Sequence, residues 1–186
     1  PDSRVTAETS EGFLAAHGDL LGDAINADLS QGLWGDQPYT VTATFEDLPL
    51  DRLAQRLLGY LRDTADDDPS EEALRDHPDA WTYALSDALC ETHPDIAFEL
   101  VRDLIRICAT PDDIALVAAG PLEDLIVQHG PDLIAAIEQE AAGSARFRFA
   151  LSGVWQRDAN PFVWARIEAA RADGPDLDAG DPLPPA

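Results

Sequence analysis

The sequence predicts an all-α protein, built as an array of short antiparallel helical hairpins that stack like a solenoid or close into a compact bundle. Proline precedes one apolar run of helical spacing after another, at positions 78, 94, 111, 121, 131 and 161. Proline favours the first helical position because its missing N–H would be unpaired there anyway. These starts, with one more near residue 145, lie about 10–17 residues apart, and short helices joined by tight turns pack as antiparallel neighbours. We see no strict sequence repeat.

The N-terminal part predicts a helix, then an extended segment, then a second helix. Residues 11–29 predict the first helix, although three glycines each weaken it by about 1 kcal/mol relative to alanine. Residues 39–45 alternate apolar side chains with threonine, which is the period of a strand. Because no second strand is expected, this segment is either an arm packed on helices, which we favour, or an edge offered to another molecule. Residues 49–63 predict a helix with five leucines on one face.

The central and C-terminal helices follow from apolar stripes between start and stop signals. Glycine at positions 130 and 143 predicts the end of a helix, and Ser144 predicts the cap of the next one. The stripes predict the following residues on inward faces: Leu100, Leu104, Leu125, Ile134, Ile137, Phe147, Leu151, Trp155, Phe162, Val163 and Ile167. We therefore expect a single helical domain over residues 1–172, comprising an N-terminal helix and arm (1–46) and the hairpin array (47–172). An acidic, proline- and glycine-rich tail, flexible or docked, covers 173–186.

Composition predicts a soluble, cytoplasmic protein. Hydrophobic residues make up 45% of the chain, and no apolar run approaches the ~18 residues of a membrane span. No basic stretch followed by an apolar run opens the chain. Cys90 and Cys108 lie inside apolar patterns, so both are expected to be buried thiols, with a bond between them left open.

The net charge of −24 excludes some partners. All 12 basic residues are arginine, against 36 acids. A chain of this charge is repelled by nucleic-acid phosphates and by anionic membranes, so neither is an expected partner. The charge is spread along the chain, with −13 over residues 1–79 and −11 over residues 80–186. Such acidity is also typical of GC-rich coding or of life in high salt.

Residues 115–167 carry a pattern that resembles a family of short bacterial proteins of unknown function. Members share AAGPLEDLL, then HG, IE, FR and VW; here these stand at Ala118–Leu125, His129–Gly130, Ile137–Glu138, Phe147–Arg148 and Val154–Trp155. The resemblance implies a bacterial helical domain and assigns no chemistry, cofactor or partner.

The candidate catalytic and metal sites each have a simpler structural explanation. His77 and His93 each precede Pro-Asp and would bind a metal only if helix starts converge, whereas capping explains both positions. Glu123, Asp124 and His129 would form an acid–base cluster only if they shared a cleft. Sequence motifs for nucleophilic, redox or phosphate-binding sites are absent. We expect no enzymatic activity, no cofactor and no metal.

Two acidic tracts predict the partner-binding surface. The first is the loop with Asp63, Asp66, Asp67, Asp68, Glu71 and Glu72, which is alternatively a solvated connection between helices. The second runs from residue 112 to 140 with seven acids, Glu123 and Asp124 among them, and no arginine. In "ARFRF" we expect Phe147 in the core, Arg146 and Arg148 paired with acids, and Phe149 off the core face, available to a partner.

These observations predict a non-enzymatic, acidic helical binding protein. Its most concrete form is an inhibitor or immunity-type protein that engages a basic protein partner, such as a toxin, nuclease or DNA-binding protein. One alternative is a scaffold or adaptor whose acidity reflects the whole proteome of its source. A second is a metal-dependent enzyme that uses His77, His93 and Asp95 at helix starts.

Overall fold

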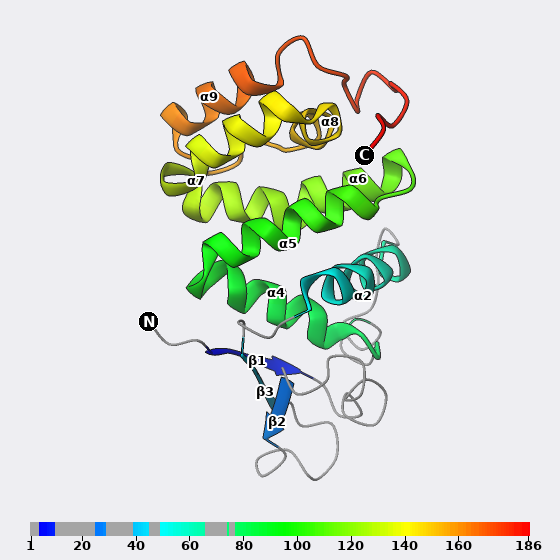
Figure 1. Ribbon diagram of the computed structural model, residues 1–186, viewed down its shortest axis with the longest axis vertical. Coiled ribbons are helices and arrows are strands. Elements are labelled where there is room, and N and C mark those ends of the chain that lie inside the picture. The colour runs from blue at the N-terminus through cyan, green and yellow to red at the C-terminus, as the bar shows by residue number, and fades with distance from the viewer. Residues whose placement is uncertain (1–3, 10–24, 29–38, 45–48, 66–73, 75–76) are drawn as a thin grey trace. The chain divides into compact units, whose positions relative to one another are not determined.

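The structure is a computed structural model, and two compact units divide the chain, Pro1–Ile96 and Ala97–Ala186. It describes residues 4–9, 25–28, 39–44, 49–65, 74 and 77–186, drawn in colour in Figure 1. Each unit is described by itself below. The second unit is described throughout, and the first in part.

The first unit contains a three-stranded antiparallel sheet. Its strands are β1 (Arg4–Thr9), β2 (Ile25–Asp28) and β3 (Tyr39–Thr44), in the order β1-β3-β2. Tyr39–Thr44 is therefore a strand as predicted, but the expectation that it lacks a partner in the chain is wrong, because it is the central strand. The predicted helix over 11–29 is wrong at Ile25–Asp28, and its earlier part lies outside the described residues. The sequence of β2 is INAD, and asparagine, alanine and aspartate are all depleted in strands. The segment is a strand because it pairs with β3.

Two helices of the first unit pack against each other, α2 (Leu50–Asp63) and α4 (Ala80–Thr92). Helix α2 buries the face predicted from its leucines, including Leu53 and Leu57 at 0% exposure. Helix α4 begins two residues after Pro78, and its buried face carries Trp81 and two leucines. Helix α5 (Pro94–Ile107) starts at its predicted proline and continues into the second unit.

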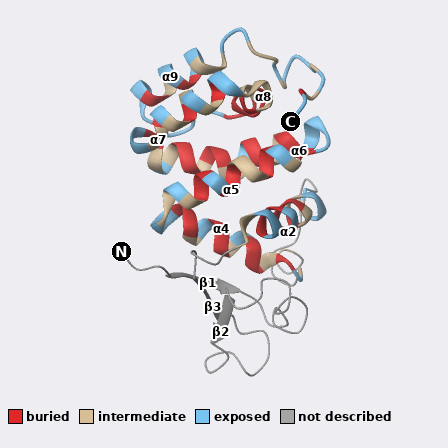
Figure 2. Cartoon of the chain, viewed as in Figure 1, coloured by how far each residue is buried: buried red, intermediate tan, exposed pale blue. Residues whose placement is uncertain are grey.

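The second unit is all-helical. After α5 come α6 (Pro111–Val117), a π-helical segment (Ala118–Leu122), α7 (Glu123–Gly143), α8 (Ala145–Ser152) and α9 (Pro161–Arg171). Helix α7 contacts both α8 and α9, which also contact each other. Figure 2 shows the buried positions in red along the inner faces of these helices. Over the described residues from Leu50 onward, the prediction of an all-α array of helices is confirmed.

Side chains cap three of the predicted helix starts, including the cap predicted at Ser144. The Thr110 hydroxyl accepts from the backbone N–H of Asp113 at 3.1 Å, and the Asp113 carboxylate accepts in return from the Thr110 N–H at 3.0 Å. The hydroxyl of Ser144 and the side-chain oxygen of Asn160 accept from Phe147 N and Phe162 N at the starts of α8 and α9. Each cap satisfies backbone donors that the first turn of a helix leaves open.

The predicted break at Gly130–Pro131 is wrong, because α7 runs through both residues. Gly130 is buried against α9, and a Cβ atom built on it would lie 2.7 Å from Cγ1 of Val163. The glycine is therefore required by the close approach of α7 and α9 and does not end the helix. Backbone geometry instead breaks at Gly120 (φ −123°, ψ −106°), directly before Pro121.

Three arginines close the C-terminal ends of three helices. Nη1 of Arg146 donates to the carbonyls of Arg106 (3.0 Å) and Cys108 (2.9 Å) at the end of α5. Arg148 donates in the same way to Ala141 near the end of α7, and Arg171 donates to Ser152 at the end of α8. The prediction that Arg146 and Arg148 pair with acids is wrong: they bind orphan carbonyls, where a cation also meets the negative end of the helix dipole.

Cys90 and Cys108 are buried thiols, as predicted, and they are not joined by a disulfide. Within the described parts of the chain, no helix combines the length and the apolar character that a membrane span requires.

Candidate functional site

The first predicted acidic tract is only partly described. Asp63 ends α2 with its side chain 68% exposed, and its Oδ2 lies 3.3 Å from Nε2 of His77. Asp66, Asp67, Asp68, Glu71 and Glu72 lie outside the described residues. Their role in partner binding stays a prediction.

The predicted contact residues of the second tract do not form a free surface. Glu123 is 1% exposed, and Phe149 is 0% exposed in the core. The expectation that Phe149 faces a partner is wrong, because α8 packs against both α7 and α9 and is covered on two sides. Asp124 is half-buried beside Glu123 in the first turn of α7.

Glu123 instead organises the loop between α8 and α9. One carboxylate oxygen accepts from the backbone N–H of Trp155 at 3.0 Å, and the other lies 2.8 Å from Nε of Arg157. Arg157 has a positive φ of 37°, which is uncommon for a residue with a side chain. A buried carboxylate is tolerable only when paired and hydrogen-bonded, as here. In this loop conformation the Trp155 residue is 70% exposed to solvent.

The tract without arginine is neutralised in space by arginines from elsewhere in the chain. Arg166 of α9 binds Glu138 through two hydrogen bonds of 2.7 and 2.6 Å, and Arg102 of α5 lies 2.8 Å from Glu140. Together with Glu123 and the capping Asp113, four of the seven acids therefore act inside the unit. Glu123 is therefore not available to a partner, whereas the role of Asp124 in partner binding stays a prediction.

The unit boundary shows where the excess charge lies. Residues 1–96 hold 21 acids and 5 arginines, a net charge of −16, whereas residues 97–186 hold 15 acids and 7 arginines, a net charge of −8. The even spread of charge expected from the sequence results from dividing the chain at residue 79. That division places α4 and its acids in the second half, whereas α4 belongs to the first unit. The first unit carries twice the charge of the second.

The outer face of α4 is acidic. Tyr83, Asp87 and Glu91 are exposed and follow one another at four-residue spacing, so they share one side of the helix. Asp95 is exposed in the first turn of α5. These three acids belong to no ion pair among the described residues, and the sequence has no arginine between positions 75 and 102. We name Asp87, Glu91 and Asp95 the α4 acidic face; the four-residue spacing is the signal that could have identified it.

His77, Tyr60 and Tyr83 lie at the junction of α2 and α4, where the ring centroids of the two tyrosines are 5.9 Å apart. Nδ1 of His77 accepts from the Asp79 N–H at 3.0 Å, which leaves the proton on Nε2, toward Asp63. The rings of Tyr60 and His77 meet edge to face at 5.2 Å, and burial raises the pKa of the Tyr60 hydroxyl. His77 thus closes the turn before α4. His93 lies next to Thr92, whose hydroxyl is 2.8 Å from its Nδ1. Across the described residues, no group of three potential ligands is placed to hold a metal.

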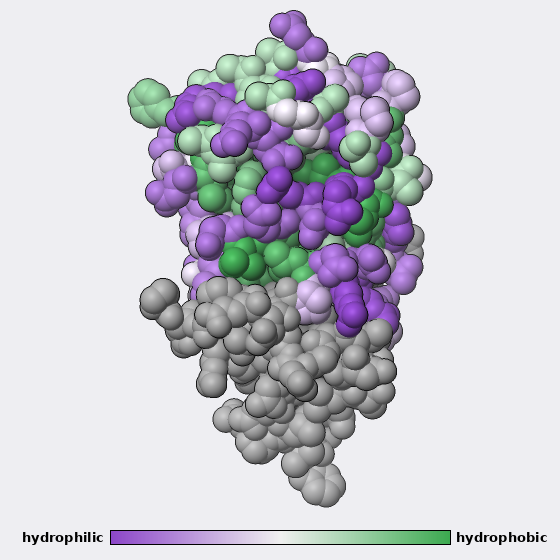
Figure 3. All heavy atoms as spheres, viewed as in Figure 1, coloured by the Kyte–Doolittle hydropathy of each residue, from purple (hydrophilic) through white to green (hydrophobic). Residues whose placement is uncertain are grey.

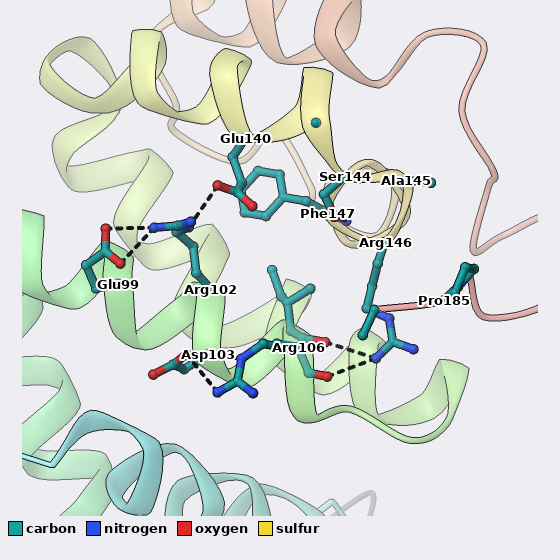
Figure 4. Close-up of a pocket in the computed structure, with 13 residues that line it drawn as sticks. Glu99, Arg102, Asp103, Arg106, Glu140, Ser144, Ala145, Arg146, Phe147 and Pro185 are labelled. Atoms are coloured by element: carbon teal, nitrogen blue, oxygen red, sulfur yellow. Dashed lines mark hydrogen bonds and ion pairs between the residues drawn. The ribbon is translucent and has the colours of Figure 1, made fainter.

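A pocket of about 530 Å³ opens in the second unit between α5, the end of α7 and the start of α8. Figure 4 shows three arginines and three acids around it: Arg102, Arg106, Arg146, Glu99, Asp103 and Glu140. Arg102 binds both oxygens of Glu99, at 2.9 and 2.7 Å, and Arg106 binds Asp103. Pro185 and Ala186 line the pocket from the tail. Sequence reasoning missed this pocket, although arginines four residues apart on α5 share one face.

Two aromatic side chains predicted to face inward are exposed. Trp155 is 70% and Phe162 85% exposed, whereas Val163 and Ile167 of α9 are buried as predicted. In Figure 3 hydrophobic residues, in green, reach the surface among hydrophilic ones, in purple, over the helices. Trp155 lies beyond the end of α8, and Phe162 stands in the first turn of α9. Helical periodicity therefore does not fix which way either side chain points.

Comparison with known families gives one match. A family model described as "Family of unknown function (DUF6869)" matches residues 69–174. Neither the curated proteins nor the solved structures contain a match to the chain.

Proposed function

The chain belongs to a family of unknown function, DUF6869, and from its surface chemistry we propose that it is a non-enzymatic binding protein that engages a basic protein partner through its first unit. The most concrete form is an inhibitor or immunity-type protein. Such a protein presents carboxylates where the phosphates of a nucleic acid would otherwise bind its target.

The observation that carries this proposal is the unbalanced charge of the first unit, expressed on the α4 acidic face. The negative electrostatic potential of exposed carboxylates is not cancelled when they have no arginine partner. Such a potential attracts a basic surface and raises the association rate by 10- to about 1000-fold. The second unit carries half this excess charge, and each of its arginines donates to an acceptor within the unit. These arginines are Arg102, Arg106, Arg146, Arg148, Arg157, Arg166 and Arg171.

The exposed acids of the second unit provide a matched control. One variant carries Asp87→Asn, Glu91→Gln and Asp95→Asn. The control carries Asp112→Asn, Asp132→Asn and Asp158→Asn, which removes the same charge from exposed positions of the second unit. Any effect of net charge alone is then equal in the two variants.

The experiment begins with capture of partners from a lysate of the source organism at low salt, followed by elution at high salt. The eluted protein is purified, and its association rate with wild type and both triple variants is measured by stopped flow at two salt concentrations. We expect the α4 variant to lose about tenfold in association rate at low salt, and the control less than twofold. A variant with Asp66, Asp67, Asp68, Glu71 and Glu72 neutralised is expected to lose binding while its helices persist.

Equal effects of the two triple variants, or binding that is indifferent to salt, would contradict the proposal. That result would favour a scaffold or adaptor whose acidity is a proteome-wide property. The exposed Trp155 and Phe162 favour this second candidate, because aromatic side chains supply much of the energy of protein interfaces. Under it, the melting temperature rises steeply with added KCl as self-repulsion is screened, and Trp155→Ala with Phe162→Ala abolishes binding.

A further inference from the structure

The tail forms one wall of the pocket in the second unit. The backbone of the tail is fixed at Leu177, whose N–H donates to Oγ of Ser152 at 2.9 Å, and a turn closes where Asp181 N donates to Asp176 O at 3.2 Å. The segment 182–186, PLPPA, then runs to the pocket. Pro184 is buried, and the next two residues line the pocket wall. The tail is thus docked, one of the two states that its composition allowed.

One arginine anchors the segment. Nε of Arg146 donates to the carbonyl of Pro184 at 2.8 Å, while Nη1 of the same guanidinium is held by the carbonyls at the end of α5. Figure 4 shows the Arg146 side chain between the end of α5 and Pro185. The donor is therefore oriented by the helix end and does not depend on the tail for its position.

The chemistry of the pocket complements a proline-rich chain. Proline has no N–H, so a proline-rich segment offers carbonyl acceptors in an extended, preformed conformation. A guanidinium has only donors. Arg106, 58% exposed at the mouth of the pocket, supplies further donors beside those of Arg146. Phe147 and Ile105, which are 1% and 3% exposed, also line the pocket.

We propose that the surface beside this pocket, centred on Arg146, is a binding site for proline-rich peptide segments, and that residues 182–186 bind there in cis and form one wall of the pocket. A segment of another protein with the same chemistry binds there when the tail leaves. The site uses residues of α5, α7 and α8 in the second unit. Its test is therefore independent of the test of the α4 acidic face.

The test uses a fluorescein-labelled peptide of residues 177–186, LDAGDPLPPA, and fluorescence anisotropy. Three proteins are compared: the intact chain, a chain that ends at Asp181, and a full-length variant with Pro184→Gly and Pro185→Gly. A tethered segment competes at an effective concentration of roughly a millimolar, so a peptide with a Kd of about 0.1 mM for the open pocket should bind the intact chain about tenfold more weakly. The full-length variant opens the pocket without shortening the chain.

Controls distinguish specific binding at the pocket from non-specific peptide binding and from the loss of a helix cap. A peptide with alanine in place of all three prolines is expected to bind the open pocket at least tenfold more weakly. Arg146→Ala in the open chain is expected to remove peptide binding, whereas Arg148→Ala, which removes a helix cap outside the pocket, is expected to keep the Kd within twofold. If Arg146→Ala unfolds the unit, the two peptides on the unmutated pocket decide the question.

Three results would overturn the proposal. They are the absence of saturable binding to both open-pocket proteins, equal affinity for the proline and alanine peptides, and unchanged affinity in a folded Arg146→Ala protein. The first would show that the segment docks only as a strap of its own chain.

Discussion

Replacing Glu123 tests whether one buried carboxylate holds the loop that presents Trp155. The carboxylate is 1% exposed and has two partners, the Trp155 N–H and the guanidinium of Arg157. Three variants separate these contacts: Glu123→Ala removes both, Glu123→Gln keeps an acceptor for the N–H, and Arg157→Ala leaves the carboxylate with one donor.

The magnitudes follow from the burial of each group. In Glu123→Ala the Trp155 N–H loses its acceptor, which costs about 1–3 kcal/mol. The lost ion pair adds only about 0–1 kcal/mol, because the Arg157 side chain is 60% exposed and regains water. We therefore expect Glu123→Ala to destabilise the unit by about 1–4 kcal/mol. Arg157→Ala is expected to cost about 1–2 kcal/mol, and almost nothing in the Glu123→Gln background, where no charge remains to be paired.

The assay is amide hydrogen exchange at Trp155 combined with urea unfolding. Exchange reports the loop directly, and each 1.4 kcal/mol of lost protection speeds it about tenfold. Wild-type exchange at the Trp155 amide in both Glu123→Ala and Arg157→Ala would refute the role assigned to the carboxylate. If Arg157→Ala lowers the free energy of unfolding as much in the Glu123→Gln background as in the wild type, Arg157 acts through something other than charge.

Three further predictions concern packing, capping and charge. Gly130→Ala is expected to destabilise α7 against α9 by about 1–2 kcal/mol in urea unfolding, despite a better helix propensity, and Val163→Ala should relieve the clash; stabilisation by the single change would contradict the close approach. Thr110→Ala is expected to cost about 1 kcal/mol in the same assay, because the Asp113 N–H loses its acceptor. Arg166→Ala should raise the pKa of Glu138 toward its ordinary value in a carbon-13 NMR titration, since the hydrogen bond from Arg166 holds that pKa low; the stability it lends is present at neutral pH and lost as pH falls through the folded-state pKa. An unchanged titration would contradict the pair.

Local signals predicted the helix starts well and the helix ends poorly. Thr110, Ser144 and Asn160 cap the helices that follow them because a cap depends on residues within one turn. Gly130 carries the same stop signal as Gly143, yet only the latter ends a helix. The difference is Val163, which approaches Gly130 from a helix much later in the chain. No local pattern contains that contact.

The candidate site was harder to predict for the same reason. A stretch of sequence without arginine does not become a surface without arginine, because Arg102 and Arg166 of other helices and Arg157 of a loop pair with its acids. The inward face of a helix is also undefined at its ends, which is where Trp155 and Phe162 lie. The acidic charge and the helical class could be predicted because they depend on composition and period alone.

The arginine caps have a consequence for how the chain assembles during synthesis. The last carbonyls of α5 are bound by Arg146, those of α7 by Arg148 and those of α8 by Arg171. In each case the cap is translated after the helix that it closes. A nascent chain that stops short of Arg146 therefore lacks the donor that binds the last carbonyls of α5. Each of these helix ends therefore gains its arginine donor only after a later part of the second unit has been synthesised and has folded onto it.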